Sequence, residues 1–193
     1  VLQGCNMRCK YCHNPETWSF DDAKFTVSAK DAFNKAYKYK NYWRKNGKPN
    51  GGITVSGGEP LLQIDFVIEF FKLAKEKGVH TTLDSSGSAF TREEPFFSKF
   101  NELIKYTDLV MLDIKHIDDA EHIKLTGHTN KNILDCARYL SDQGINMWIR
   151  HVLVPGVTDQ EEDLLALRDF AASLKTVDRV EICLLYTSPS PRD

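Results

Sequence analysis

The chain alternates short apolar runs with longer stretches whose apolar residues recur at helical spacing. This alternation predicts repeated strand–helix units, which build a parallel sheet covered by helices. The runs are apolar throughout, as expected for strands buried on both faces. The predicted strands span residues 52–56, 80–84, 109–115, 147–154 and 179–182. The predicted helices span residues 28–44, 63–77, 96–106, 130–143 and 159–174.

The length of the chain selects among the folds that such units can form. The chain has 193 residues, whereas a complete eight-stranded barrel usually needs about 250. The predicted strands and an apolar stub at residues 1–3 therefore favour a partial (β/α)6 barrel of the TIM type, an α/β fold with parallel strands. An open doubly wound sheet is the alternative, because periodicity alone does not separate the two folds.

Both ends of the sequence affect how much of it we expect to fold. The chain begins at Val1 without a methionine, in an apolar pair that predicts the last residues of a strand. Residues 183–193 resemble the translated sequence of a sequencing adapter, and a Ser/Pro-rich tail is the alternative. We therefore expect a barrel truncated at both ends, with one domain over residues 1–182.

Composition and charge exclude several classes of function. The 25 basic and 27 acidic side chains give a formal net charge of −2. We expect no nucleic-acid partner, since proteins that bind nucleic acid usually carry a basic excess. No apolar run approaches the roughly 18–20 residues that span a bilayer, and nothing resembles a secretory signal. The sequence therefore predicts a cytoplasmic protein with no membrane partner.

Polar and glycine-rich residues follow the end of every predicted strand. In parallel α/β folds the chemistry gathers at the carboxyl ends of the strands. We therefore expect these segments to form one site. They begin at Gly4 and continue at residues 56–59, 84–87, 113–115 and 150–155.

Three of the five cysteines lie within the first twelve residues, which indicates metal binding before disulfides in a chain without a secretory signal. Cys5, Cys9 and Cys12 form the pattern C-x3-C-x2-C. A structural zinc site would need a fourth ligand, but His13 adjoins Cys12 and the other cysteines lie far along the chain. C-type haem attachment or a redox disulfide would each leave one cysteine unused.

An iron–sulfur cluster is the fourth interpretation of this loop. Such clusters normally take four cysteine ligands, so three cysteines around a four-iron cubane leave one iron without a protein ligand. That iron can bind a substrate through paired nitrogen and oxygen donors, such as the amino and carboxylate groups of a methionine moiety.

Two motifs together resemble the signature of the radical S-adenosylmethionine (SAM) superfamily. The cysteine loop follows one apolar strand, and the Ser-Gly-Gly-Glu-Pro turn at residues 56–60 follows the next. A plain strand-to-helix turn is the alternative for the second motif taken alone. Within the superfamily, residues 1–182 resemble the activating enzymes of pyruvate formate-lyase. The segments that carry this resemblance are residues 4–18, 51–63, 80–87, 107–115 and 148–156.

The resemblance implies a reaction, its cofactors and its partners. Cys5, Cys9 and Cys12 would hold a 4Fe-4S cluster, and the iron without a cysteine would bind SAM. Reduction by one electron would cleave SAM, and the resulting radical would remove a hydrogen atom from a glycine of pyruvate formate-lyase. No side chain is expected to be catalytic, because the cofactors carry the chemistry. The electron donor would be a protein such as flavodoxin or ferredoxin, in an anaerobic cytoplasm.

The resemblance also implies which residues bind the cofactors. Tyr11 and His13 would border the SAM adenine, and Gly58 would contact the methionine end. Arg150 lies inside an apolar run, so it is either a paired core charge or a further SAM contact, and we favour the SAM contact. The other residues expected near SAM, or near a monovalent cation beside it, are Gly57, Glu59, Asp84, Ser85, Met111, Asp113, Ile114 and Lys115.

Simpler roles remain open for several of these residues. Tyr11 can be a packing residue and His13 a turn residue. Asp113 and Lys115 point to the same face of a strand, so they can form an ion pair and nothing more. Three later histidines, at positions 116, 122 and 128, are expected at the surface.

Three functions therefore stay open. No cysteine lies between Cys12 and Cys136. This leaves no room for the ferredoxin-like insert of relatives that activate other glycyl-radical enzymes, and favours an activase of pyruvate formate-lyase. The second hypothesis is another radical SAM enzyme, either one with a small-molecule substrate or the activase of anaerobic ribonucleotide reductase. The third is a zinc- or haem-binding module without catalysis.

Overall fold

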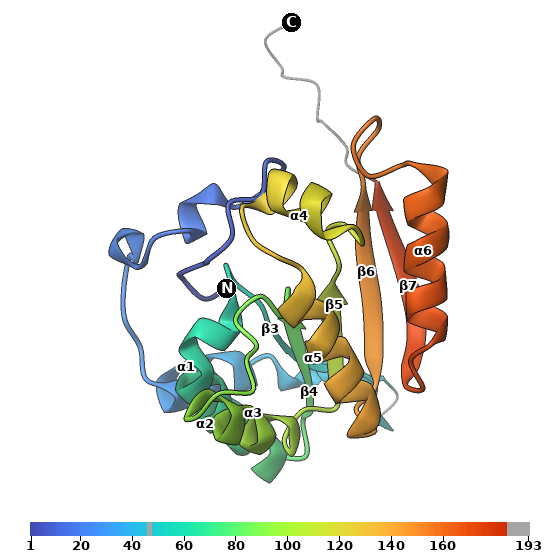
Figure 1. Cartoon of the computed structure of the whole chain (residues 1–193). Helices are drawn as coiled ribbons and strands as arrows, with labels where there is room; N and C mark the ends of the chain where they lie inside the picture. Colours follow the sequence, from blue (N-terminus) through green and yellow to red (C-terminus); the bar gives the residue numbers. More distant parts are fainter. Residues whose placement is uncertain (46–47, 185–193) are drawn as a thin grey trace, which may run out of the picture.

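A five-stranded sheet, in which all neighbouring strands are parallel, forms the centre of the molecule (Figure 1). The computed structural model describes residues 1–45 and 48–184, so most of the adapter-like segment lies outside the described residues. The strands are β3 (Gly52–Val55), β4 (His80–Ser85), β5 (Leu109–Asp113), β6 (Met147–Leu153) and β7 (Val177–Leu184).

The order of the strands decides between the two predicted architectures. Strands that are neighbours in the sheet are also successive along the chain, from β3 to β7. A doubly wound sheet reverses its strand order at a switch point, and the described strands show no reversal. The N-terminal residues add a further position to this order, because Leu2 forms a parallel bridge with Gly57 just beyond β3. The structure therefore confirms a partial barrel.

Helices connect the strands and lie around the outside of the sheet (Figure 1). Every helix in the described parts of the chain is too short or too polar to cross a lipid bilayer. The α-helices are α1 (Ala29–Tyr37), α2 (Ile64–Glu76), α3 (Phe96–Ile104), α4 (Asp119–Thr126), α5 (Lys131–Asp142) and α6 (Glu161–Ala172). The 3-10 helices are η1 (Pro15–Thr17), η2 (Phe20–Asp22), η3 (Lys40–Trp43) and η4 (Pro60–Gln63), and a short antiparallel pair is formed by β1 (Arg44–Lys45) and β2 (Lys48–Pro49).

Two helices differ from the prediction. The first predicted helix runs to residue 44, but α1 ends at Tyr37. Its buried face passes through Ala29, Phe33 and the partly buried Ala36 and Tyr37, and the positions that follow at helical spacing are exposed and polar, at Lys40 and Asn41. Helix α4 is not predicted, because only one of its three buried residues, Leu125, is apolar, so the sequence shows little apolar pattern at helical spacing.

Burial alternates along the strands and divides the sheet into two different faces. In β5, Val110 and Leu112 are buried, whereas Met111 and Asp113 are partly exposed. Strand β6 follows the same pattern, with Ile149 buried. The expectation that both faces are fully buried is therefore wrong for these strands. The second face carries polar groups toward the carboxyl end of the sheet.

Candidate cofactor site

A cavity of about 360 Å³ lies at the carboxyl end of the sheet. It brings together the cysteine loop, the glycine turn after β3, and the ends of β4, β5 and β6. The predicted site residues that line it are Cys5, Cys9, Tyr11, Cys12, His13, Gly57, Gly58, Asp84, Ser85, Asp113, Lys115 and Arg150. The strand ends therefore line one cavity, as expected, and their common role as a functional site stays a prediction.

Backbone hydrogen bonds to two different parts of the fold hold the cysteine loop. The amide of Leu2 donates to the carbonyl of Ser56 (2.8 Å), which continues the sheet into the loop. The amide of Arg8 donates to the Thr126 carbonyl (2.8 Å) and that of Lys10 to the Leu125 carbonyl (3.0 Å). The last carbonyls of a helix have no partner within the helix, so the end of α4 is a natural acceptor for this loop.

The thiols of Cys5, Cys9 and Cys12 are free and partly buried. Burial raises the pKa of Cys9 to about 11, although the nearby Lys115 acts in the opposite direction. Burial also raises the pKa of Cys5. A thiol must lose its proton to bind a metal, so loading of this loop would release protons.

The arrangement of these thiols fits a cluster with one cysteine on each iron. Within residues 1–45 and 48–184, no three His, Cys, Asp or Glu side chains gather around a single ion position. A cubane with a separate iron for each cysteine does not need the thiols to converge on one point. The three sulfurs line one cavity with room for further atoms, so the residues present fit such a group.

The glycines of the turn are required by the cysteine loop itself. The Gly58 amide donates to the Leu2 carbonyl (3.0 Å), and the Glu59 amide donates to the Gly4 carbonyl (2.8 Å). A Cβ at Gly58 would collide with the Gly4 carbonyl and would lie 2.8 Å from the Cβ of Cys5. The turn therefore supports the loop at a contact where no side chain fits.

We expect Gly58→Ala to lower stability and iron loading together. The added methyl group meets backbone atoms, which cannot move aside, and such overpacking costs about 1–3 kcal/mol. Gly78→Ala is the control, because a Cβ there meets no atom within 4 Å, although its φ of +63° adds local strain. Denaturant unfolding and iron analysis of both variants check this. Equal iron loading in Gly58→Ala and wild type would contradict it.

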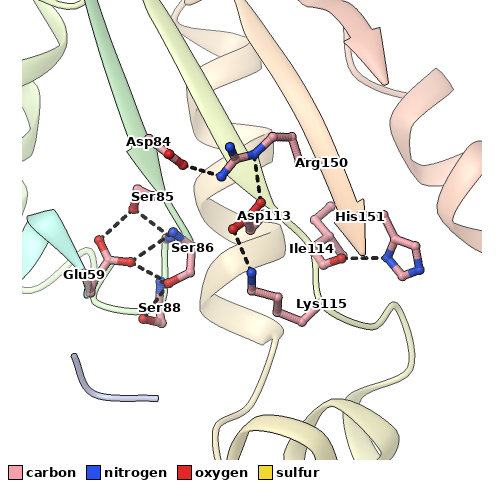
Figure 2. Close-up of polar contacts among 11 residues, drawn as sticks. Glu59, Asp84, Ser85, Ser86, Ser88, Asp113, Ile114, Lys115, Arg150 and His151 are labelled. Atoms are coloured by element: carbon pink, nitrogen blue, oxygen red, sulfur yellow. Dashed lines mark hydrogen bonds and ion pairs between the residues drawn. The ribbon is translucent and has the colours of Figure 1, made fainter. Parts of the chain in front are cut away.

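Four charged side chains that line the cavity form a row in which acidic and basic groups alternate (Figure 2). Arg150 on β6 donates through Nη2 to Asp84 Oδ1 on β4 and through Nε to Asp113 Oδ1 on β5, the latter over 2.9 Å. Lys115 Nζ donates to Asp113 Oδ2 (2.7 Å). Strand register explains the arrangement, since Asp113 pairs directly with Arg150 in the sheet.

The electrostatics of this row depend on its burial. The four side chains are only 14% to 22% exposed. Burial alone would raise the pKa of Asp113, but Lys115 and Arg150 bring it below its ordinary value. At Asp84 burial prevails over the attraction of Arg150 and raises the pKa. Both carboxylates already accept hydrogen bonds from cations, so the monovalent cation stays a prediction.

Tyr11 lines the same cavity. Its hydroxyl is buried and makes no hydrogen bond within the described residues. The Lys115 ammonium lies 6.0 Å from the centre of the Tyr11 ring. A buried hydroxyl without a partner is costly, so this group fits a site whose ligand supplies the missing hydrogen bond.

Comparison with known proteins agrees with this geometry. The sequence profile of the radical SAM superfamily matches residues 1–168. The chain belongs to the radical SAM superfamily. A pyruvate formate-lyase-activating enzyme of Streptococcus mutans is 51% identical over 187 residues, which cover 96% of this chain and 70% of the relative. This radical SAM chain therefore belongs with the pyruvate formate-lyase-activating enzymes.

Solved structures share the fold of this chain. A domain of a pyruvate formate-lyase-activating enzyme from Bacteroides vulgatus is 27% identical with a TM-score of 0.62, covering 73% of this chain and 86% of that chain. Streptococcus suis SuiB bound to S-adenosylmethionine is 20% identical with a TM-score of 0.74, covering 98% of this chain and 40% of that chain.

Three of the residues predicted near the cofactors do not line the cavity of this radical SAM chain, namely Glu59, Met111 and Ile114. Glu59 is fully buried, and its carboxyl oxygens accept hydrogen bonds from Ser85, Ser86 and the Leu61 amide (Figure 2). Ile114 is fully buried, and its carbonyl lies 2.8 Å from His151 Nδ1. The roles of Glu59 and Ile114 as SAM contacts stay predictions, and any such contact would have to be made by their backbone atoms.

The structure also places residues that the sequence analysis misplaced or missed. His116 and His122 are 2% and 0% exposed, so their predicted surface position is wrong. Their ring nitrogens lie near local backbone groups: His116 Nδ1 accepts from the Asp118 amide, and His122 Nδ1 contacts the His128 carbonyl. The cavity residues that were missed include Met7, Trp18 and Val152. Val152 shares a strand face with Arg150, so strand periodicity could have found it.

Proposed function

We propose that this radical SAM chain activates a pyruvate formate-lyase by generating a glycyl radical on it. A 4Fe-4S cluster, when bound, would supply the electron that cleaves SAM to a radical able to take a hydrogen atom from a glycine. The identity to curated activating enzymes supports the protein substrate. The convergence of the three cysteines, the glycine turn and the charged row on one cavity is the observation that carries the proposal.

The chain's own residues would hold and orient the two cofactors. Cys5, Cys9 and Cys12 would ligate the cluster, and three ligands leave one iron free for SAM. Lys115 and Arg150 present cationic groups to the cavity that suit a carboxylate. Gly57 and Gly58 pack against the backbone of the cysteine loop, and because glycine has no side chain, their carbonyl oxygens would be open to the amino group of SAM.

The aromatic and peripheral residues would complete SAM binding. Tyr11 and His13 line the same cavity as the thiols and suit contact with the adenine. The unpaired Tyr11 hydroxyl supports a polar contact there. The electron donor would be a protein such as flavodoxin or ferredoxin, and a cluster with a free iron suits an anoxic cytoplasm.

Anaerobic reconstitution of the protein with iron and sulfide tests the proposal. We expect a reduced cluster whose electron paramagnetic resonance (EPR) spectrum changes when SAM is added. We also expect a glycyl radical signal when the reconstituted protein, SAM and a reductant are incubated with pyruvate formate-lyase. A reduced cluster that does not respond to SAM would contradict the radical SAM assignment.

The protein substrate is tested separately by variation of the lyase. A lyase in which the radical-forming glycine is replaced by alanine is the matched control, and it should give no radical. Cleavage of SAM without any radical on intact lyase would favour the other radical SAM enzymes, including the activase of anaerobic ribonucleotide reductase.

A further inference from the structure

A hydrogen-bonded network of buried polar side chains connects the glycine turn to the cysteine loop. It begins at Glu59, whose carboxyl oxygens accept from Ser85 Oγ (2.7 Å) and the Ser86 amide (3.0 Å). The Ser86 hydroxyl lies within hydrogen-bond distance of Glu59 Oε2 (2.5 Å) and of Ser88 Oγ (2.9 Å). Glu59, Ser85, Ser86 and Ser88 are at most 7% exposed, so these hydrogen-bonded side chains form a rigid support.

The network contacts the cysteine loop at Asn6. Ser88 Oγ donates to Asn6 Oδ1 (2.6 Å), and Asn6 Nδ2 donates to the Ser88 carbonyl (3.3 Å). Both ends of the Asn6 amide are therefore held by one residue, 82 positions along the sequence. Asn132 on α5 also donates to the Ser88 carbonyl (2.5 Å), which braces Ser88 from the other side.

We propose that Asn6 and Ser88 are positioning residues that set the cysteine loop relative to the SAM-binding turn. The turn already holds the start of the loop through the carbonyls of Leu2 and Gly4. Asn6 lies on the other side of Cys5, so the loop is fixed on both sides of its first cysteine. This inference rests on the proposed function and extends it to residues that touch neither cofactor.

The position of the loop matters because SAM must meet two parts of the site at once. The amino and carboxylate groups of its methionine end would bind the free iron held by the loop, and the same end would also contact the glycine turn. Small displacements of supporting groups are enough to weaken such double contacts. Loss of the Asn6–Ser88 contact should therefore weaken SAM binding more than it affects the cluster itself.

The test uses Asn6→Ala and Ser88→Ala, each reconstituted anaerobically, with SAM affinity measured by titration. We expect each variant to bind SAM about tenfold more weakly, because each removes the hydrogen bond from Ser88 Oγ to Asn6 Oδ1, while iron per chain and the thermal midpoint stay near wild type. The double variant should be no weaker than either single variant, because the residues act as a pair. The EPR change on SAM addition should be reduced in all three.

Ser141→Ala is the matched control, because it also removes a buried serine hydroxyl, one that accepts from the Lys175 amide away from the cavity. Asn6 is exposed, so its variant keeps the test valid if Ser88→Ala fails to fold. Wild-type SAM affinity in Asn6→Ala, additive losses in the double variant, or a parallel loss of iron and stability would each overturn the inference. A wild-type cluster that does not respond to SAM would overturn the proposed function as well.

Discussion

Cys9→Ala is expected to lose nearly all iron after anaerobic reconstitution. The wild-type loop offers three thiols to one cavity, and Cys9 lies between the other two along the loop. Loss of an outer-shell partner alone costs about 10- to 100-fold in metal affinity, so loss of a ligand should cost at least as much. Iron and sulfide analysis, with the absorption spectrum, measures the effect.

Cys136→Ala is the matched control for this experiment. Cys136 is a free cysteine on α5 that is 1% exposed and does not line the cavity. Its replacement should leave the iron content at the wild-type value, apart from a small loss of stability from the cavity it creates. Unchanged iron content in Cys9→Ala would refute the ligand assignment. An equal loss of iron in Cys9→Ala and Cys136→Ala would also contradict it, because removal of any cysteine would then have the same effect.

Arg150→Met is expected to destabilise the fold strongly and to weaken SAM binding. Arg150 is the group that joins Asp84 to Asp113. Methionine is apolar, so its introduction leaves Asp84 without its cation and Asp113 with Lys115 alone. Breaking a buried ion pair by removing one partner costs about 3–5 kcal/mol, and the remaining exposure of these side chains places the expected loss near the lower end. Denaturant unfolding at neutral pH measures it.

The difference between Arg150→Met and wild type should shrink as the pH falls. In wild type the pKa of Asp113 is lowered, so its contribution to stability is present above the unfolded pKa of about 3.9 and is lost below it. In the variant both carboxyl pKa values rise, so the penalty is full at neutral pH and disappears once the carboxyls are protonated. The double variant Asp84→Asn/Arg150→Met should recover part of the loss. Equal stability of Arg150→Met and wild type at neutral pH would contradict the bridging role.

The sequence by itself determined the strands of the sheet, most of the helices and the main motifs. The strands at residues 80–84 and 147–154 agree within one residue with β4 and β6, because a strand needs only a local apolar run with turns around it. The cysteine loop and the glycine turn were visible as spacings within a few residues. The prediction that the two motifs lie close together followed from one rule, that the carboxyl ends of parallel strands lie at the same edge of the sheet.

Only the tertiary structure decided which distant groups meet. Whether the sheet is a partial barrel depended on strand order, which local periodicity does not contain. Arg150 meets Asp84 and Asp113 because three strands are in a particular register. Glu59 hydrogen-bonds to Ser85 and Ser86 and does not itself line the cavity, and Ser88 meets Asn6 across 82 positions. Such contacts depend on how loops and strands pack on one another, whereas a pattern in the sequence reports only on neighbours along the chain.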